Sequence, residues 1–146
     1  MNRLLSAAAI ACSLSLSACS VEEGELLGEA QAATAIAAVE TLAAADLAAR
    51  VAAGEVLLVD VRTPAEFAES RIPGALNAPL STFDPAAIPM EAGRETILYC
   101  RSSHRSGQAA EMLSEFTQGT VHHLEGGIMA WEEAGLETVA EPAPAT

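Results

Sequence analysis

Two short, uninterrupted apolar runs constrain the fold of this chain most. Residues 56–61 read VLLVDV and residues 96–99 read TILY. Runs of this length, without polar residues at alternate positions, are typical of strands that are covered on both faces in a parallel sheet. Asp60 lies at the end of the first run and Cys100 follows the second. Since sites in such sheets form beyond the carboxyl ends of the strands, we expect the chemistry of this protein near these two residues.

Helical patterns alternate with the strands. Residues 42–53 carry apolar side chains at helical spacing and are followed by Gly54, a residue suited to a left-handed cap. Thr63-Pro64-Ala65-Glu66 has the composition of a capping box with proline at the first helical position. Further helices are predicted at 64–70, 106–116 and 128–134, and further strands at 75–78 and 121–124. This alternation predicts an α/β fold whose sheet is mostly parallel and has helices on both faces.

The charge of the chain excludes some classes of partner. The 146 residues contain 20 acidic and seven basic side chains, a formal net charge of −13, and every basic residue is arginine. A surface this acidic argues against binding nucleic acid and against electrostatic attachment to anionic lipid.

The first 19 residues, MNRLLSAAAIACSLSLSAC, have the architecture of an export signal, with Arg3 followed by an apolar and small-residue run. The last four, LSAC, resemble the lipobox of bacterial lipoproteins. That resemblance implies a signal peptide over 1–18 and a lipid anchor on Cys19. Ser20 then favours the outer membrane of a Gram-negative bacterium, with the protein facing the periplasm. Ordinary signal cleavage is the alternative; an uncleaved anchor is disfavoured because 4–18 is shorter than the roughly 20 residues that span a bilayer.

Three segments are expected after the signal peptide. Residues 19–40 are acidic and then rich in alanine, which predicts a partly helical tether. Residues 41–139 form the folded domain, and residues 140–146, with two prolines, are expected to be disordered.

Cys100 opens a loop with an unusual composition. If processing removes Cys12 and acylates Cys19, Cys100 is the only free thiol left and has no intramolecular disulfide partner. The loop from Cys100 reads CRSSHRS and leads into a predicted helix, where backbone N–H groups and guanidinium groups favour a thiolate. The candidate anion-binding residues are Arg101, Ser102, Ser103, His104, Arg105 and Ser106.

Three segments resemble the signatures of the rhodanese superfamily, in order and at ordinary spacing: LLVDVRTPAEFAESRIPGALNAPL, ILYCRSSHRSGQAAEML and HLEGGIMAWEEAGL. The resemblance implies a three-layer α/β/α sandwich around a sheet of about five strands, and a sulfurtransferase that requires no metal or organic cofactor. Cys100 would be the nucleophile and would carry a persulfide. Its partners would be small sulfur-containing anions, such as thiosulfate, and thiol acceptors, which include a protein thiol.

The resemblance also assigns supporting roles and shows two departures. Asp60 and Arg62 match an Asp-Val-Arg element, and we expect them to brace the loop, with Asp60 pairing with a loop arginine. Many members have glycine where this chain has Ser103, which introduces strain if that position needs a positive φ. Ser70-Arg71 replaces a common Gly-His pair.

The same residues admit other interpretations. A cysteine phosphatase is disfavoured because the spacing between Cys100 and Arg105 is one residue shorter than in tyrosine phosphatases. A binding or sulfur-carrier module with little catalytic activity is the second alternative. His122 and His123 are interpreted as partly buried strand residues that point to opposite faces, rather than as metal ligands. His104 either tunes the charge of the loop or lies at its rim.

Overall fold

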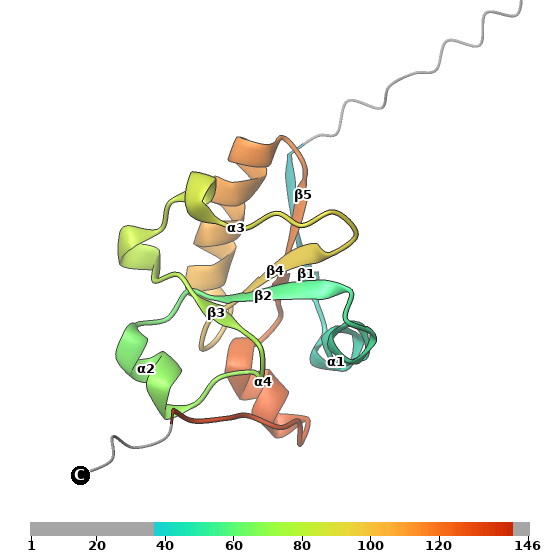
Figure 1. The fold of residues 1–146 in the computed structure, drawn as a ribbon, viewed down its shortest axis with the longest axis vertical. Coiled ribbons are helices and arrows are strands. Elements are labelled where there is room, and N and C mark those ends of the chain that lie inside the picture. Colours follow the sequence, from blue (N-terminus) through green and yellow to red (C-terminus); the bar gives the residue numbers. More distant parts are fainter. Residues whose placement is uncertain (1–36, 142–146) are drawn as a thin grey trace, which may run out of the picture. The chain divides into compact units, whose positions relative to one another are not determined.

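Five parallel strands form a sheet in the computed structural model, which describes residues 37–141 (Figure 1). The strands are β1 (Ala38–Leu42), β2 (Val56–Asp60), β3 (Leu76–Asn77), β4 (Glu95–Tyr99) and β5 (Thr120–Leu124). Their order across the sheet is β1-β5-β4-β2-β3. All four pairings are parallel, so the predicted α/β class with a five-stranded sheet is confirmed.

Three helices lie between the strands and a fourth follows the last strand, and two of the helix ends match local sequence signals. They are α1 (Ala44–Ala53), α2 (Pro64–Glu69), α3 (His104–Thr117) and α4 (Gly127–Glu133), with short 3-10 turns η1 (Leu80–Thr82) and η2 (Pro85–Ala87). Gly54 closes α1 in the left-handed conformation. The capping box at Thr63 and Glu66 is complete, because each side chain accepts a hydrogen bond from the other residue's backbone N–H.

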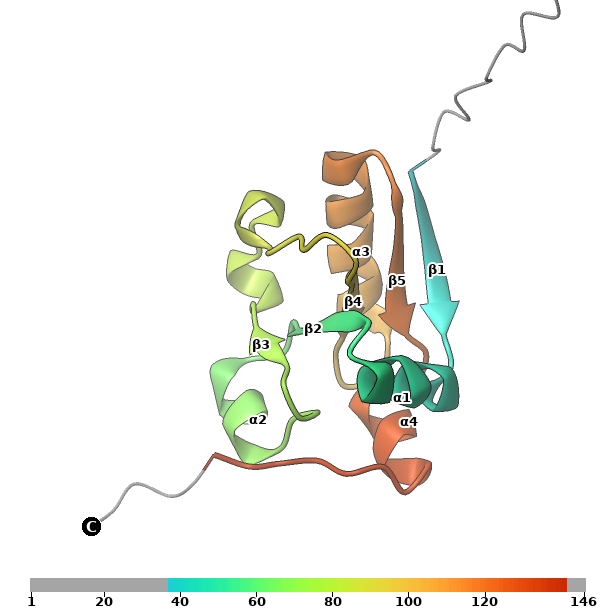
Figure 2. The same cartoon turned by 45° about the vertical axis from the view of Figure 1, so that its right-hand side comes forward.

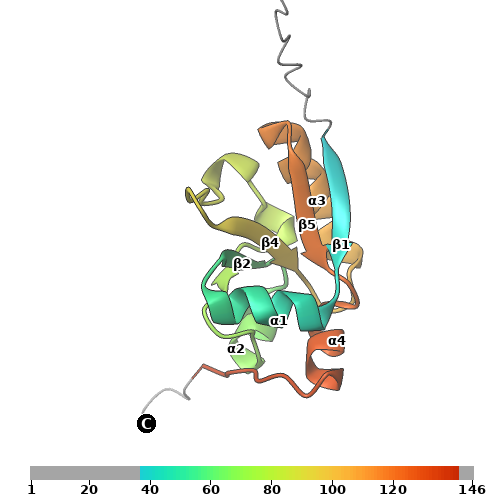
Figure 3. The ribbon, with the colours of Figure 1, turned by 90° about the vertical axis from the view of Figure 1, so that its right-hand side faces the viewer.

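Each face of the sheet carries its own apolar core. One core lies beneath α1 and α4, and the other lies beneath α3, η1 and η2; Figures 2 and 3 show α1 and α3 on opposite sides of the strands. The first includes Leu47, Leu58, Ile97, Tyr99, Leu124 and Trp131. The second includes Val59, Val61, Leu98, Cys100, Ala109 and Leu113. Both faces are covered, which explains why β2 and β4 lack polar alternation.

Strand β1 was missed by the sequence interpretation. The predicted tether over 19–40 overlaps it, and Leu42, assigned to the first helix, is the last residue of the strand. The segment AVETL has a weak strand pattern because β1 is a half-exposed edge strand, and its pairing with β5 rather than its own propensity defines it. The folded domain therefore begins before residue 41. The signal peptide, Cys19 and the rest of the tether lie outside the described residues.

The chain after α4 returns to the domain. Arg71 and Val139 exchange two backbone hydrogen bonds of 2.8 Å in an antiparallel bridge, and Trp131 Nε1 donates to Glu137 O at 2.9 Å. The side chain of Trp131, in α4, is buried in the core beneath that helix. Among residues 37–141, no helix has both the length and the apolar character needed to cross a bilayer.

The first turn of α4 holds the segment that follows β4. Ile128 N donates to Cys100 O at 2.8 Å, and Met129 N donates to Arg101 O at 3.3 Å. This close approach requires Gly127, because a Cβ atom there would lie 2.5 Å from backbone atoms of Cys100 and Arg101. Gly127 also has a φ of +61°. A glycine of α4 therefore fixes the position of the candidate loop.

We expect Gly127→Ala to lower the free energy of unfolding by about 3 kcal/mol, since it combines a backbone clash with an unfavourable positive φ. Gly135→Ala is the matched control: Gly135 also has a positive φ, of +72°, but nothing lies within 4 Å of its Cβ position. Gly135→Ala should lower the free energy of unfolding by about 1 kcal/mol. Urea unfolding measures both, and equal losses would show that the contact with the loop is unimportant.

Candidate active site

Cys100 lies at the carboxyl end of β4, where the sequence placed it. It is a free cysteine, and only 1% of its surface is exposed. Its side chain belongs to the core beneath α3, together with Val61 and Leu98. The sulfur is therefore almost completely covered by the surrounding residues.

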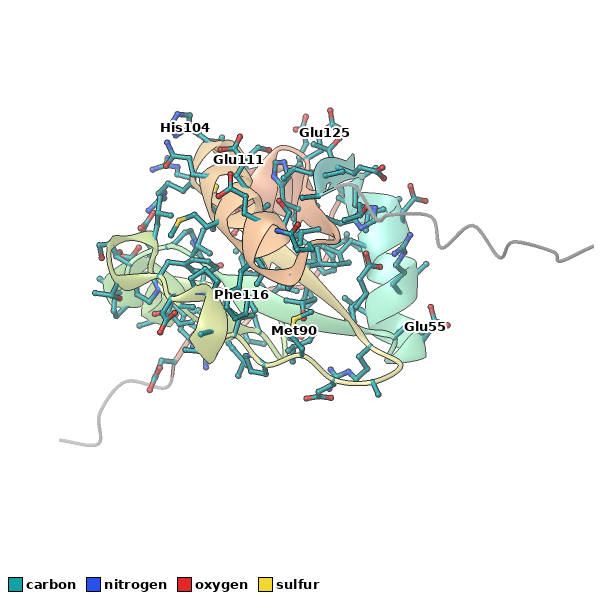
Figure 4. All side chains as sticks on the ribbon, turned by 90° about the horizontal axis from the view of Figure 1, so that it is seen from above. Glu55, Met90, His104, Glu111, Phe116 and Glu125 are labelled. Carbon is teal, nitrogen blue, oxygen red and sulfur yellow. The ribbon has the colours of Figure 1, made fainter. Side chains whose placement is uncertain are left out.

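The loop is shorter than the sequence indicated, because α3 begins at His104 rather than at Ser106. Arg101 and Ser102 are exposed in the connection, whereas His104 and Arg105 belong to the first helical turn. The first turn of a helix leaves backbone N–H groups without intrahelical acceptors, so an anion can bind there. His104 is exposed, and Figure 4 shows its ring pointing away from the domain, as the rim interpretation requires.

Ser103 has the positive φ that its position suggested, with φ +80° and ψ −29°. The serine side chain makes two compensating hydrogen bonds. Ser103 Oγ donates to Leu124 O at 3.1 Å and accepts from Gly126 N at 2.6 Å. The residue that replaces the common glycine therefore closes the loop by linking it to the turn between β5 and α4.

Arg105 is held by α2. Its guanidinium makes two hydrogen bonds of 2.8 Å to the carboxylate of Glu66, one to each oxygen. The hydrogen bond from Arg105 lowers the pKa of Glu66 to about 2, with further help from Thr63. The same carboxylate caps α2, so a single side chain joins the start of α2 to the start of α3.

The expected pairing of Asp60 with a loop arginine is wrong. The carboxylate of Asp60, which is fully buried, instead binds Arg62, two residues later on the same connection, with contacts of 2.6 and 3.0 Å. Burial opposes the charge of Arg62, but the bonds to Asp60 outweigh it and raise the pKa of this arginine. Arg62 also donates to Ser70 O at 2.5 Å. The physical reason is proximity: the turn after β2 folds Arg62 back onto the nearer carboxylate.

Asp60 and Arg62 thus brace the turn between β2 and α2. The amide of Asn77 strengthens this turn by donating to Asp60 O and to Arg62 O, both at 2.9 Å. Arg101, by contrast, is exposed and has no ion-pair partner within residues 37–141. Of the two loop arginines, only Arg101 therefore has an uncompensated charge.

The histidine pair separates as strand geometry predicts. His122 lies on the α1 face, where Nε2 is 3.1 Å from Glu40 and Nδ1 contacts Glu95. His123 lies on the α3 face, with Nδ1 3.1 Å from Ser106 Oγ. Within the described part of the chain, no three His, Cys, Asp or Glu side chains gather in a group suited to a metal ion.

The contact between His123 and Ser106 was missed by the sequence interpretation. Ser106 is fully buried, and its hydroxyl also lies 3.5 Å from Cys100 Sγ. The only sequence signal was that His123 and the start of α3 would share one face of the sheet. That signal is insufficient because it does not give the register of the helix on the strand.

Two hollows flank the loop. The first has a volume of about 300 Å³, a mainly apolar lining and Arg105 at its edge; its residues are Val61, Thr63, Pro79, Leu80, Ser81 and Arg105. The second has about 250 Å³, is more polar and contains Arg101; its residues are Arg62, Glu66, Glu69, Arg101, Ile128, Met129 and Glu132. Each hollow therefore presents one loop arginine.

The sequence and the structure of this chain are both similar to those of rhodanese-like proteins. Residues 43–134 match the family model of the rhodanese-like domain. A sulfurtransferase of Allochromatium vinosum is 44% identical over 86 residues, which are 59% of this chain and 80% of that protein. An uncharacterized protein of Synechocystis is 48% identical over 84 residues, 58% of this chain but only 47% of its own length. The crystal structure of a rhodanese-related protein from Thermoplasma volcanium superposes with a TM-score of 0.60 at 29% identity, covering 70% of this chain and 99% of that one.

Substitutions at Ser103 test whether its hydroxyl offsets the backbone strain. Ser103→Ala keeps the positive φ but loses both hydrogen bonds, so we expect a loss of about 2 kcal/mol in the free energy of unfolding. Ser103→Gly loses the same bonds but relieves the strain, and should be about 1 kcal/mol more stable than the alanine variant. Urea unfolding gives this order, and an alanine variant as stable as the wild type would refute it.

The buried ion pair between Asp60 and Arg62 predicts that Asp60→Asn strongly lowers the free energy of unfolding. The substitution leaves the guanidinium of Arg62 buried without its counter-charge, which should cost about 3 kcal/mol of unfolding free energy. Glu91→Gln removes a carboxylate from the exposed pair with Arg94 and should cost less than about 1 kcal/mol. Thermal and urea unfolding of both variants check this difference; a loss in Asp60→Asn no greater than in the control would contradict it.

Proposed function

The chain belongs to the rhodanese-like family, and on this premise we propose that it is a sulfurtransferase that carries a sulfane sulfur on Cys100. The observation that supports the proposal best is the setting of Cys100. A free thiol lies at the carboxyl end of a central strand, against the first turn of α3 and 3.5 Å from a buried hydroxyl. The relationship to sulfurtransferases agrees with this setting.

The reaction is a double displacement. The thiolate of Cys100 attacks the outer sulfur of a donor such as thiosulfate, the sulfur–sulfur bond of the donor breaks, and sulfite leaves with the electron pair. Cys100 then carries a persulfide. A thiol or cyanide attacks the outer sulfur of the persulfide, and the thiolate of Cys100 is released. The backbone N–H groups of the first turn of α3 stabilise the anionic persulfide.

Arg101 and Arg105 have different roles in the binding of the sulfur donor. Arg105 is compensated by Glu66, so its role is to hold α2 against the loop rather than to contribute a full charge. Arg101 is exposed beside the polar hollow, where its guanidinium can bind the oxygens of a donor. The apolar hollow beside Arg105 suits the organic part of a persulfide donor or a thiol acceptor.

The same contacts disfavour the phosphatase alternative. A phosphatase loop uses its arginine to bind the phosphate, and here the arginine at that end of the loop, Arg105, is already bound by both oxygens of Glu66. A sulfur-carrier or binding module without turnover is the remaining alternative. It would form the persulfide but release it slowly.

The location of the protein is a separate proposal that depends only on the first 20 residues. Because MNRLLSAAAIACSLSLSAC has the features of a lipoprotein signal, we propose that Cys19 carries the lipid and that the domain faces the periplasm from the outer membrane. The lipid would keep the active cysteine in an exported compartment.

Mass spectrometry tests the sulfurtransferase proposal. The full chain, incubated with thiosulfate, should gain one sulfur atom, and fragmentation should place it on Cys100. Cys100→Ser should gain none. Because Cys12 and Cys19 are also thiols in an unprocessed chain, a Cys12→Ser/Cys19→Ser double variant serves as the matched control and should be labelled like the wild type.

Addition of cyanide or a small thiol then separates the two remaining alternatives. Loss of the extra sulfur from Cys100 with formation of thiocyanate, or of the acceptor persulfide, supports a transferase. A stable adduct indicates a carrier module. No adduct from thiosulfate or from a small-molecule persulfide would exclude sulfur transfer by Cys100.

A further inference from the structure

A row of three buried side chains connects the active cysteine to a histidine on the next strand. Ser106 Oγ lies 3.5 Å from Cys100 Sγ on one side and 3.1 Å from His123 Nδ1 on the other. The exposed fractions are 1% for Cys100, 0% for Ser106 and 7% for His123. Water therefore has little access to the row, and each polar atom depends on its neighbours for hydrogen bonds.

The hydroxyl hydrogen of Ser106 has three acceptors within reach. The third is Ser103 O, at 3.0 Å. This carbonyl already accepts a hydrogen bond of 2.8 Å from Gly107 N. A carbonyl oxygen has two lone pairs, so Ser103 O can accept from both groups and competes for the single hydroxyl hydrogen of Ser106. An anionic sulfur is a stronger acceptor than a neutral carbonyl oxygen, and the state of the imidazole decides whether His123 competes for the same hydrogen.

Building on the proposed sulfurtransferase, we propose that His123 is a positioning residue that directs the hydroxyl of Ser106 toward the anionic sulfur of Cys100. When Nδ1 carries its hydrogen, it donates to Ser106 Oγ, and the hydrogen of Ser106 then points to the thiolate or to the persulfide. Two aligned donors thus stabilise negative charge on sulfur in a site closed to water.

The proton of the thiol can be accounted for along the row. In the thiol state, Cys100 donates to Ser106 Oγ, Ser106 donates to Nδ1, and the ring hydrogen is on Nε2. On ionisation the thiol proton passes to Ser106, the hydroxyl proton passes to Nδ1, and Nε2 releases its proton to solvent at the imidazole, the one member of the row that keeps some exposure, 7%. The ring is neutral before and after, and no oxidant or further reactant is needed.

The surroundings of His123 favour the neutral ring. The residues that share its face from the neighbouring elements are uncharged: Thr41, Leu98, Ser106 and Gly107. The titratable groups on those elements and on β5 are Glu40, Glu95, Tyr99, Cys100, His104, Arg105, Glu111, Glu115 and His122. Glu40 and Glu95 bind His122 on the opposite face. Burial lowers the pKa of His123, so the ring stays neutral near pH 7.

The substitutions His123→Asn and His123→Gln test the proposal, because they place a side-chain amide at the positions of the two different ring nitrogens. In His123→Asn the amide occupies the position of Nδ1 and can donate to Ser106; in His123→Gln it lies one carbon further along and matches Nε2. The measurement is the rate at which iodoacetamide alkylates Cys100 in the full chain, followed by the mass of the Cys100 peptide across a pH series. This readout needs no sulfur donor.

We expect His123→Gln to raise the pH of half-maximal alkylation by about one unit, which lowers the rate near pH 7 about tenfold. His123→Asn should stay close to the wild type. Ser106→Ala should shift the profile as His123→Gln does, and the double variant should shift it no further, because both changes break one row. His122→Gln, on the opposite face, is the matched control and should leave the profile unchanged.

Two outcomes would overturn the proposal: an unchanged profile in His123→Gln, or an equal shift in His123→Asn and His123→Gln. Urea unfolding of each variant verifies that the domain is folded under the assay conditions. The result is also separable from the proposed function. If the wild type forms no persulfide but the alkylation profile shifts as expected in the variants, sulfur transfer is excluded and the role of His123 stands. If the wild type forms the persulfide but the profile of His123→Gln is unchanged, only the proposed role of His123 is excluded.

Discussion

The hydrogen bonds from the first turn of α4 to the carbonyl groups of Cys100 and Arg101 are the contact on which the site depends. They hold the backbone at the point where β4 ends. They can form only because Gly127 has no Cβ, which would clash with the backbone of Cys100 and Arg101. The backbone of Cys100 and Arg101 is therefore tied to the position of α4. A backbone fixed in this way allows side chains on three other elements, α2, α3 and β5, to meet the loop with defined geometry.

Ion pairs near the loop determine which of its arginines keeps an uncompensated charge. Arg62 is neutralised by Asp60, and Arg105 is neutralised by Glu66. Both pairs are built from residues close to strand or helix ends, so they join elements without adding net charge. Arg101 is left as the cation of the loop in a protein with a formal net charge of −13. If the donor is an anion, as proposed, the attraction of this one guanidinium has to outweigh the repulsion between the donor and the acidic surface, and physiological salt screens the distant charges more than the near one.

The sequence predicted those parts of the structure that depend on local chemistry. The apolar runs located β2 and β4, and the capping box at Thr63 located α2, because these signals act within a few residues. The edge strand β1, the partner of Asp60 and the contact of His123 with Ser106 were not predictable in the same way. Each depends on which segment lies alongside another, and pairing register and helix placement are set by the whole fold rather than by propensity.

Strand β5 shows why the missed element bears on function. Its end receives the side chain of Ser103 through Leu124 O, and its α3 face carries His123 toward Ser106. Two of the contacts that shape the loop thus originate from a strand that would be the edge of the sheet without β1. The pairing of Ala38–Leu42 with Thr120–Leu124 places Thr41 beside His123 and gives the backbone of β5 a partner on both sides. An unpaired edge strand frays and admits water. The segment Ala38–Leu42, whose first three residues fall within the predicted tether, therefore protects the strand that carries His123 from fraying, and the candidate site depends on the outer strand of the sheet.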